Sequence, residues 1–231
     1  MGYLPISVNL DGRRCVVAGG GEVAERKVLA LLESGARVCV ISPKLTPELQ
    51  RLASANAFER LDREWQPGDL EGCLLAFAAT DDSELHRAMA GEARALRVPI
   101  NVADEPELCD FIMPSVVRRG DLQVAISTSG TSPALASRVR RDLQVIIGPE
   151  YETVTQIMRA ARTYVRKRQH DARERARILQ ALAASDIVEH VRQADWAAID
   201  LLLNQHLGAG LDVLRLNPER LRPATEFSRD T

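Results

Sequence analysis

Three consecutive glycines, residues 19–21, separate an apolar run from an amphipathic segment, which is the layout of a strand, a phosphate-binding turn and a helix start. Gly19, Gly21 and Ala24 match the pattern G-x-G-x-x-[G/A]. In this pattern the first glycine permits the tight turn, the second lets the backbone approach a diphosphate, and the small third residue allows close helix-on-strand packing. Free N–H groups at the helix start would bind the anion. An ordinary strand-to-helix turn also uses small residues, but the flanking segments favour nucleotide binding.

The carboxylate that usually accompanies such a turn is missing. In many dinucleotide sites an acidic residue about 20 positions after the glycines, at the end of the second strand, binds the adenosine ribose. Here the corresponding residues are Ser42, Pro43 and Lys44. Either Ser42 or backbone groups around Pro43 hold the ribose, or the site takes a nucleotide other than NAD, since Lys44 would suit a 2′-phosphate. Spacing alone leaves these alternatives open.

Composition limits the other functions. The chain has 231 residues, of which 45% are hydrophobic and 27% charged, so it can bury a core without disulfides or metals. The formal net charge of −2 gives no overall field for polyanions, and no nucleic-acid partner is expected. The first residues lack a basic region followed by an apolar run, and no segment reaches the ~20 apolar residues that cross a bilayer. We therefore expect a soluble cytoplasmic protein with no membrane partner.

The cysteines and histidines do not indicate a metal centre. Cys15, Cys39, Cys73 and Cys109 lie far apart, without the C-x-x-C spacing of zinc or redox sites. Three of them fall in or beside apolar runs, so we expect small buried hydrophobic side chains in a reducing compartment. The four histidines form no close pair, and no structural metal site is expected.

Alternating strands and helices are expected to position the glycine turn. Apolar runs predict strands at residues 14–18, 37–42, 59–65, 73–79 and 99–102. Between them, periodic segments predict helices at 22–34, at 47–55 after Thr46, and from Asp81 or Asp82 to residue 96. This alternation implies a parallel, doubly wound sheet with its ligand at the carboxyl ends of the strands.

The second half of the chain has a different pattern. Segments 115–118 and 122–127 predict a hairpin, and Ser132-Pro133 predicts a helix that ends near residue 147. Further helices are predicted from residue 151, at 172–184 and at 186–207. An apolar stripe along the first of these indicates core or dimer packing; its members are Val154, Ile157, Met158, Ala161 and Val165.

Five motifs along the chain occur in an order that identifies a family. They are Gly19-Gly20-Gly21-x-Val23-Ala24-x-Arg26-Lys27, Ala79-Thr80-Asp81-Asp82, Asn101-Val102-x-Asp104, Phe111-Ile112-Met113-Pro114 and Gly130-Thr131-Ser132-Pro133-Ala134-Leu135-Ala136. Together they resemble the precorrin-2 dehydrogenase/sirohydrochlorin ferrochelatase family, which makes sirohaem, over residues 3 to about 210. The methyltransferase half of the fused sirohaem synthases has no counterpart in the sequence, so we expect the stand-alone form of the family.

The resemblance implies an architecture in several parts. The expected fold is α/β, with a Rossmann-like parallel sheet domain, then a small α+β dimerisation region and a C-terminal helical domain. We place the NAD-binding domain at residues 1–113, the dimerisation region at 114–148 and the helical domain at 149–215. Residues 216–231, which carry prolines and charge, are expected to be a flexible tail. The expected assembly is a homodimer.

The resemblance also implies how NAD binds. The family lacks the usual ribose carboxylate, in agreement with Ser42 and Pro43. The residues expected to bind NAD or lie close to it are Gly19, Gly21, Glu22, Val23, Ser42, Pro43, Lys44, Thr80 and Asp81.

In one respect this chain departs from the family. Ser129 stands where glycine is frequent, and a positive φ there would strain the backbone.

Asp104 is the residue expected to act as an acid–base catalyst. Oxidation of precorrin-2 to sirohydrochlorin requires hydride transfer to the nicotinamide and loss of a proton, which a nearby carboxylate would accept. Insertion of Fe²⁺, a substrate here and not a bound cofactor, also removes pyrrole protons. The resemblance gives Asp104 a part in both steps. Without it, Asp104 would be interpreted as a turn residue before Pro106.

Arginines and hydroxyl groups are expected to bind the carboxylate-rich substrates, because guanidinium groups bind carboxylates bidentately. Basic clusters occur at 118–119, 138–141 and 159–177, but Asp171 and Glu174 interrupt the last one, as on a solvated helix face. RNA binding by that helix is an alternative, although it lacks interleaved aromatic residues. The residues expected to bind precorrin-2 or sirohydrochlorin are Asn101, Ser127, Thr128, Thr131, Ser132, Arg118 and Arg138.

The sequence therefore predicts an NAD-dependent precorrin-2 dehydrogenase that also inserts Fe²⁺ into sirohydrochlorin. Two alternatives remain open: a dehydrogenase without chelatase activity, and a nucleotide-sensing module that turns over no substrate.

Overall fold

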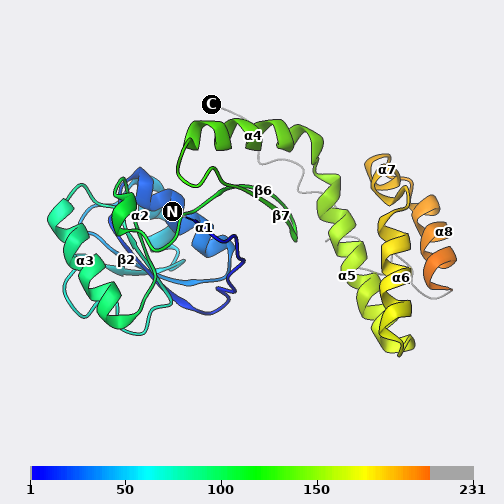
Figure 1. Cartoon of the computed structure of the whole chain (residues 1–231), viewed down its shortest axis with the longest axis horizontal. Coiled ribbons are helices and arrows are strands. Elements are labelled where there is room, and N and C mark those ends of the chain that lie inside the picture. Colours follow the sequence, from blue (N-terminus) through cyan, green and yellow to red (C-terminus); the bar gives the residue numbers. More distant parts are fainter. Residues whose placement is uncertain (1, 209–231) are drawn as a thin grey trace. The chain divides into compact units, whose positions relative to one another are not determined.

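The computed structural model describes residues 2–208. The expected tail at 216–231 and residues 209–215 of the expected helical domain lie outside the described residues. The chain divides into two compact units, Met1–Met113 and Pro114–Thr231 (Figure 1).

The first unit contains a five-stranded parallel sheet in the order β3-β2-β1-β4-β5. Its strands are β1 (Arg14–Ala18), β2 (Arg37–Ile41), β3 (Glu59–Leu61), β4 (Leu75–Ala78) and β5 (Ile100–Val102). The chain moves outward from β1 to β3 and then returns to β4 on the other side of β1. The expected doubly wound, Rossmann-like sheet is confirmed, and its topological switch point lies between β1 and β4.

Helices cover both faces of the sheet. On one face α1 (Glu22–Glu33) and α2 (Pro47–Ser54) pack against Cys15, Val17 and Phe77. On the other face α3 (Ser83–Leu96) packs against Val16 and Ala18. Successive residues of β1 thus point to opposite layers, as the pleat of a strand requires. A short 3₁₀ helix, η1 (Pro106–Leu108), follows β5.

The edge strand β3 is shorter than predicted, because the chain turns into a loop of its own after Leu61. The carboxylate of Asp69 binds the guanidinium of Arg63 at 2.7 Å and accepts a hydrogen bond from the backbone N–H of Gln66 at 2.8 Å. Trp65, predicted to be the last strand residue, instead packs into the hydrophobic core from this loop.

The second unit begins with the predicted hairpin of β6 (Ser115–Arg119) and β7 (Leu122–Ile126), which are antiparallel. The helix α4 (Pro133–Ile146) packs on this hairpin and is capped by Ser132, whose Oγ accepts the N–H of Leu135 at 3.2 Å. Up to residue 208, where the described part of the chain ends, four helices follow: α5 (Glu150–Arg168), α6 (Ala172–Ala183), α7 (Ile187–Arg192) and α8 (Trp196–Leu207).

The apolar stripe of α5 belongs to the core of this helical region. Val154, Ile157 and Ala161 are buried against α6, α7 and α8. The single helix predicted at 186–207 is wrong, because the chain breaks between α7 and α8. Ala194 adopts a left-handed backbone with φ of 54°, and Asp195 then caps α8 by accepting the N–H of Ala198 at 3.0 Å.

The three cysteines expected to be buried are buried, namely Cys15, Cys39 and Cys73. Burial raises the pKa of all three thiols, to about 11 for Cys39 and for Cys73. They therefore act as small core side chains. Within residues 2–208, no helix combines the length and apolar character needed to cross a membrane.

Candidate functional site

The glycine turn connects the end of β1 to the start of α1, and two of its glycines are required by close packing. Gly19 has a φ of 117°, and a Cβ atom there would lie 2.1 Å from the carbonyl oxygen of Ala79 at the end of β4. A Cβ atom on Gly20 would lie 2.0 Å from the carbonyl oxygen of Lys44 after β2. Side chains at these positions would push apart the ends of three neighbouring strands.

Gly21 differs, because a Cβ atom there would meet no atom within 4 Å. This residue is the N-cap of α1 and provides no side chain to cap the helix. No side chain at the N-cap accepts the N–H groups of Glu22 and Val23 at the helix start, where the positive end of the helix dipole also lies. The residues present fit a dinucleotide, because a diphosphate needs close backbone approach and free N–H donors.

The loop after β2 is held by Ser42. Its hydroxyl donates to the carbonyl oxygen of Lys44 at 2.6 Å and accepts the N–H of Lys44 at 3.3 Å. Arg60 on β3 reaches the carbonyl oxygen of Pro43 at 3.4 Å. Pro43 and Lys44 are exposed, whereas Ser42 is buried. Of the two ribose-binding alternatives within an NAD site, this geometry favours the backbone around Pro43.

The predicted residues after β4 shape the start of α3. Thr80 Oγ1 accepts the N–H of Asp82 at 3.3 Å, and Asp82 caps the helix by accepting the N–H groups of Glu84 and Leu85. The cap is thus Asp82, while Asp81 is exposed.

Asp104 follows β5 on the same edge of the sheet. Its backbone is left-handed, with φ of 58°, and its side chain is exposed. Within residues 2–208 its carboxylate has no hydrogen-bond or ion-pair partner, so its oxygens are free to accept a proton. The glycine turn, the Ser42 loop, Thr80 and Asp104 follow β1, β2, β4 and β5 in turn, and the carboxyl ends of these parallel strands lie on one edge.

Asn101, predicted to bind substrate, is buried on β5 and has partners within the fold. Its Oδ1 lies 2.6 Å from Nζ of Lys27 on α1, and its Nδ2 donates to the carbonyl oxygen of Phe111 at 3.0 Å. The ammonium of Lys27 also lies 5.5 Å from the centre of the Phe77 ring. Burial lowers the pKa of Lys27, and the charges of Cys109 and Asp104 oppose that shift.

Sequence reasoning missed three polar residues of this edge: Lys27, His86 and Glu105. Lys27 lies one helical turn after Val23 in the glycine motif, and that spacing could have revealed it. Nothing local singled out His86 on α3, whose Nδ1 lies 2.8 Å from Oε1 of Glu105.

The predicted substrate residues of the second unit fall into two groups. Ser127 and Thr128 hold the turn after β7, where their hydroxyls accept the N–H groups of Ser129 and Ser132, each at 3.0 Å. Ser132 caps α4, and Thr131 is exposed in the same turn. Ser129 has a φ of 52°, so the turn does require a left-handed residue where this chain lacks glycine.

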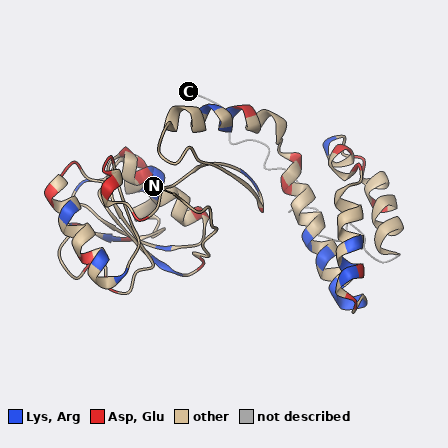
Figure 2. Ribbon diagram, viewed as in Figure 1, with Lys and Arg blue, Asp and Glu red and all other residues tan. Residues whose placement is uncertain are grey.

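The two predicted substrate-binding arginines lie on different elements. Arg118 is half-buried on β6, and Arg138 on α4 forms a loose, exposed ion pair with Asp142 at 3.5 Å. The larger basic cluster gathers where α5 ends and α6 begins (Figure 2). There Arg177 is paired with Glu174 at 2.7 Å, and Arg175 donates to the carbonyl oxygens of Gln169 and His170. Part of this basic cluster therefore pairs with carboxylate and carbonyl groups of its own segment of the chain.

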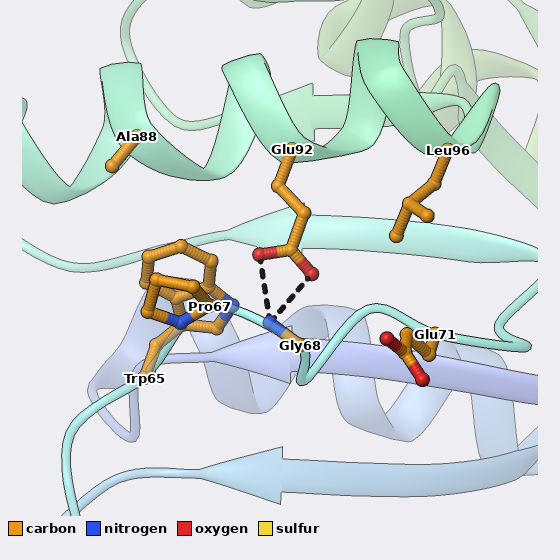
Figure 3. Close-up of a pocket in the computed structure, with 7 residues that line it drawn as sticks. All are labelled: Trp65, Pro67, Gly68, Glu71, Ala88, Glu92 and Leu96. Atoms are coloured by element: carbon orange, nitrogen blue, oxygen red, sulfur yellow. Dashed lines mark hydrogen bonds between the residues drawn. The ribbon is translucent and has the colours of Figure 1, made fainter.

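A pocket of about 310 Å³ lies away from the glycine turn (Figure 3). It is formed by α3 and the loop before β4, and Glu92 spans it by accepting the N–H of Gly68 at 3.1 Å. Because Gly68 precedes β4 and Leu96 precedes β5, the pocket lies toward the amino ends of these strands. Among residues 2–208, no group of three His, Cys, Asp or Glu side chains is arranged to hold a metal ion.

Two families of proteins match this chain. Residues 6–115 match a family of NAD(P)-binding proteins, and residues 119–145 match the central domain of sirohaem biosynthesis proteins. These segments cover the glycine turn, Asp104 and most of the hairpin and α4.

Two similar proteins are sirohaem synthases. The chain is 37% identical over 211 residues to a sirohaem synthase of Pseudomonas aeruginosa, which covers 91% of this chain and 45% of that protein. It is 42% identical over 168 residues to a sirohaem synthase of Methylobacillus flagellatus, covering 73% and 36% of the two chains. The chain thus spans less than half the length of these relatives.

A solved structure shares the fold. SirC, a precorrin-2 dehydrogenase, superposes with a TM-score of 0.69 over 88% of this chain and 98% of its own, at 22% identity. The chain has the ordered motifs and the Rossmann-like sheet, and its relatives are sirohaem synthases. It therefore belongs to the precorrin-2 dehydrogenase/sirohydrochlorin ferrochelatase family.

Proposed function

We propose that this protein oxidises precorrin-2 to sirohydrochlorin with NAD. The observation that carries the proposal is the arrangement of one sheet edge, where the anion-binding turn after β1 and the free carboxylate of Asp104 after β5 flank the switch point. The names of the relatives support the choice of substrate.

NAD, when bound, supplies a hydride acceptor. The N–H groups of Glu22 and Val23 would hold its diphosphate, Gly21 would allow it to approach, and backbone groups around Pro43 would contact its ribose. As a substrate C–H bond breaks and its electron pair leaves as hydride, Asp104 accepts the proton that precorrin-2 loses. The products are sirohydrochlorin, NADH and one proton, which Asp104 then passes to water.

The test is an anaerobic assay of precorrin-2 oxidation, followed at the nicotinamide absorbance. We expect NADH in a one-to-one ratio with the sirohydrochlorin formed, and parallel runs with NADP measure the preference that Lys44 leaves open. NAD binding without any NADH would contradict the proposal and favour the nucleotide-sensing alternative.

We further propose that the protein inserts Fe²⁺ into sirohydrochlorin. Chelation displaces two pyrrole protons for each metal ion, and the free carboxylate of Asp104 is suited to accept them. Purified sirohydrochlorin with Fe²⁺ or Co²⁺, without NAD, tests this step separately. A rate equal to that without protein would leave a dehydrogenase that relies on a separate chelatase.

We also propose a cytoplasmic homodimer. Large apolar side chains of α4 are exposed, including Leu135, Val145 and Ile146, and a second copy of the chain would cover them. The free thiols support a reducing compartment. Sedimentation equilibrium tests the assembly: Val145→Glu should dissociate a dimer built on α4, and a monomeric wild-type protein would contradict it.

A further inference from the structure

The residue that follows Asp104 is held by a buried histidine. His86 lies on the first turn of α3 and is only 4% exposed, and its Nδ1 is 2.8 Å from Oε1 of Glu105. The carbonyl oxygen of Glu105 also accepts the N–H of Leu108 at 3.1 Å. Glu105 is thus tied through its side chain to α3 and through its backbone to η1.

The backbone of Asp104 depends on such contacts. Aspartate adopts a left-handed backbone more readily than most residues with a side chain, but the conformation is still less favourable than the right-handed one, so contacts of the neighbouring residues help to hold it. On the side of β5, Ala103 N–H donates to the carbonyl oxygen of Ala78 at 2.8 Å, and Val102 N–H donates to Cys109 Sγ at 3.1 Å. On the other side stands Glu105. Asp104 is therefore a single residue between two anchored neighbours.

Packing alone does not explain a histidine at position 86. Its Nε2 is enclosed and has no hydrogen-bond partner among residues 2–208. Leaving such an atom unpaired is unfavourable, and an apolar side chain could fill the same space without this cost. The contact that distinguishes His86 from an apolar residue is the one between Nδ1 and Glu105.

We propose that His86 and Glu105 form a clasp that positions Asp104 for proton transfer. Both are positioning residues that act through Asp104. The inference rests on the proposed function, in which Asp104 is the base.

The first test compares three variants in the NADH assay. Glu105→Ala should lower kcat at least about 10-fold while the KM for NAD and precorrin-2 changes less than about threefold, because a misplaced catalytic group costs rate and not binding. Glu105→Gln, whose amide can still bind Nδ1, should retain kcat within about threefold. Glu107→Ala is the matched control, since Glu107 is an exposed acidic residue of η1, the helix that follows Glu105. Equal kcat in Glu105→Ala and Glu107→Ala would overturn the clasp.

The second test asks whether Glu105 acts through Asp104. In an Asp104→Asn background, Glu105→Ala should lower the residual rate less than about twofold, because the group to be positioned is already lost. Effects that multiply would show that Glu105 acts elsewhere, and would contradict the proposal.

Hydrogen exchange separates this inference from the proposed function. If the wild-type protein forms no NADH, the function fails, and the clasp is then judged by amide exchange in residues 103–110. Glu105→Ala should speed that exchange about 10-fold or more, whereas Glu107→Ala should not. Equal exchange in both variants would overturn the clasp.

Discussion

The ammonium nitrogen of Lys27 lies 2.6 Å from Oδ1 of Asn101 and so joins α1 to β5. One end of this contact belongs to the helix that starts at the glycine turn, and the other belongs to the strand that leads to Asp104. The half-buried cation contacts an amide oxygen and an aromatic face, and burial lowers its pKa. A charge retained under such conditions is expected to serve the site.

Lys27→Met tests that role. We expect kcat to fall at least about 10-fold, because Asn101 loses its partner and the site loses a fixed positive charge. The free energy of unfolding, from urea titration, should change less than about 2 kcal/mol, since the lost hydrogen bond and the relieved burial of charge oppose each other. Arg26→Met is the control, because Arg26 is the exposed neighbour in the motif. Equal kcat in the two variants would show that the contact between Lys27 and Asn101 supports only the fold and not the reaction.

The glycines of the turn should respond differently to alanine. Gly21→Ala places its methyl in open space at a φ of −82°, so thermal unfolding should be unchanged while the Kd for NAD rises at least about 10-fold. Gly19→Ala would bring the methyl against the carbonyl of Ala79 and should destabilise the fold by several kcal/mol. Calorimetric NAD titration and a melting curve measure both effects. Unchanged NAD affinity in Gly21→Ala would show that the diphosphate does not bind at this turn.

Replacement of Ser129 by glycine should stabilise the protein. Its φ of 52° costs a serine about 1 kcal/mol, of which the greater freedom of unfolded glycine offsets a part. Ser129→Gly should therefore raise the free energy of unfolding by about 0.5 kcal/mol. Ser127→Gly serves as the contrast, because it deletes the hydroxyl that binds the N–H of Ser129 and should lower stability. A lower free energy of unfolding in Ser129→Gly would contradict the inference that the backbone of Ser129 is strained.

Alkaline pH should destabilise the protein through two buried thiols. The pKa values of Cys39 and Cys73 are about 11 in the fold against 9.0 in an exposed chain. A raised pKa stabilises the fold below pH 9, and this contribution is lost as the pH rises to 11, because the unfolded chain releases its protons first. The loss is about 2–3 kcal/mol per thiol. Urea titrations should show that loss in the wild-type protein relative to Cys39→Ala/Cys73→Ala, and a constant difference would contradict it.

Most of the fold could be predicted from local sequence. Apolar runs located all five strands of the sheet, and Thr46, Asp82 and Ser132 marked three helix starts by their capping chemistry. The strand predicted at 59–65 was too long because a loop held by Asp69 begins after Leu61, and the helix predicted at 186–207 was wrong because apolar periodicity continues through a break. The break before α8 depends on a left-handed alanine, Ala194, a choice that residue type does not indicate.

The candidate site was only partly predictable. Gly19 and Gly21 were predicted from the spacing of the glycine motif, whereas Asp104 was predicted only from the resemblance to the family. Lys27 and Asn101 are 74 positions apart, and His86 and Glu105 are 19 apart, so each pair exists only once the strands are ordered in the sheet. Ser42 was recognised by position, but its closed hydrogen bonds with Lys44 became evident only in the loop geometry.

The measurement that tests the account most directly is precorrin-2 oxidation by Asp104→Asn under anaerobic conditions, with Glu107→Gln as the matched control. We predict that Asp104→Asn binds NAD with unchanged Kd and melts as the wild-type protein does, while its rate of NADH formation falls about 10²–10⁴-fold. Glu107→Gln should match the wild-type rate. A wild-type rate in Asp104→Asn would show that another group accepts the proton and would contradict the central claim.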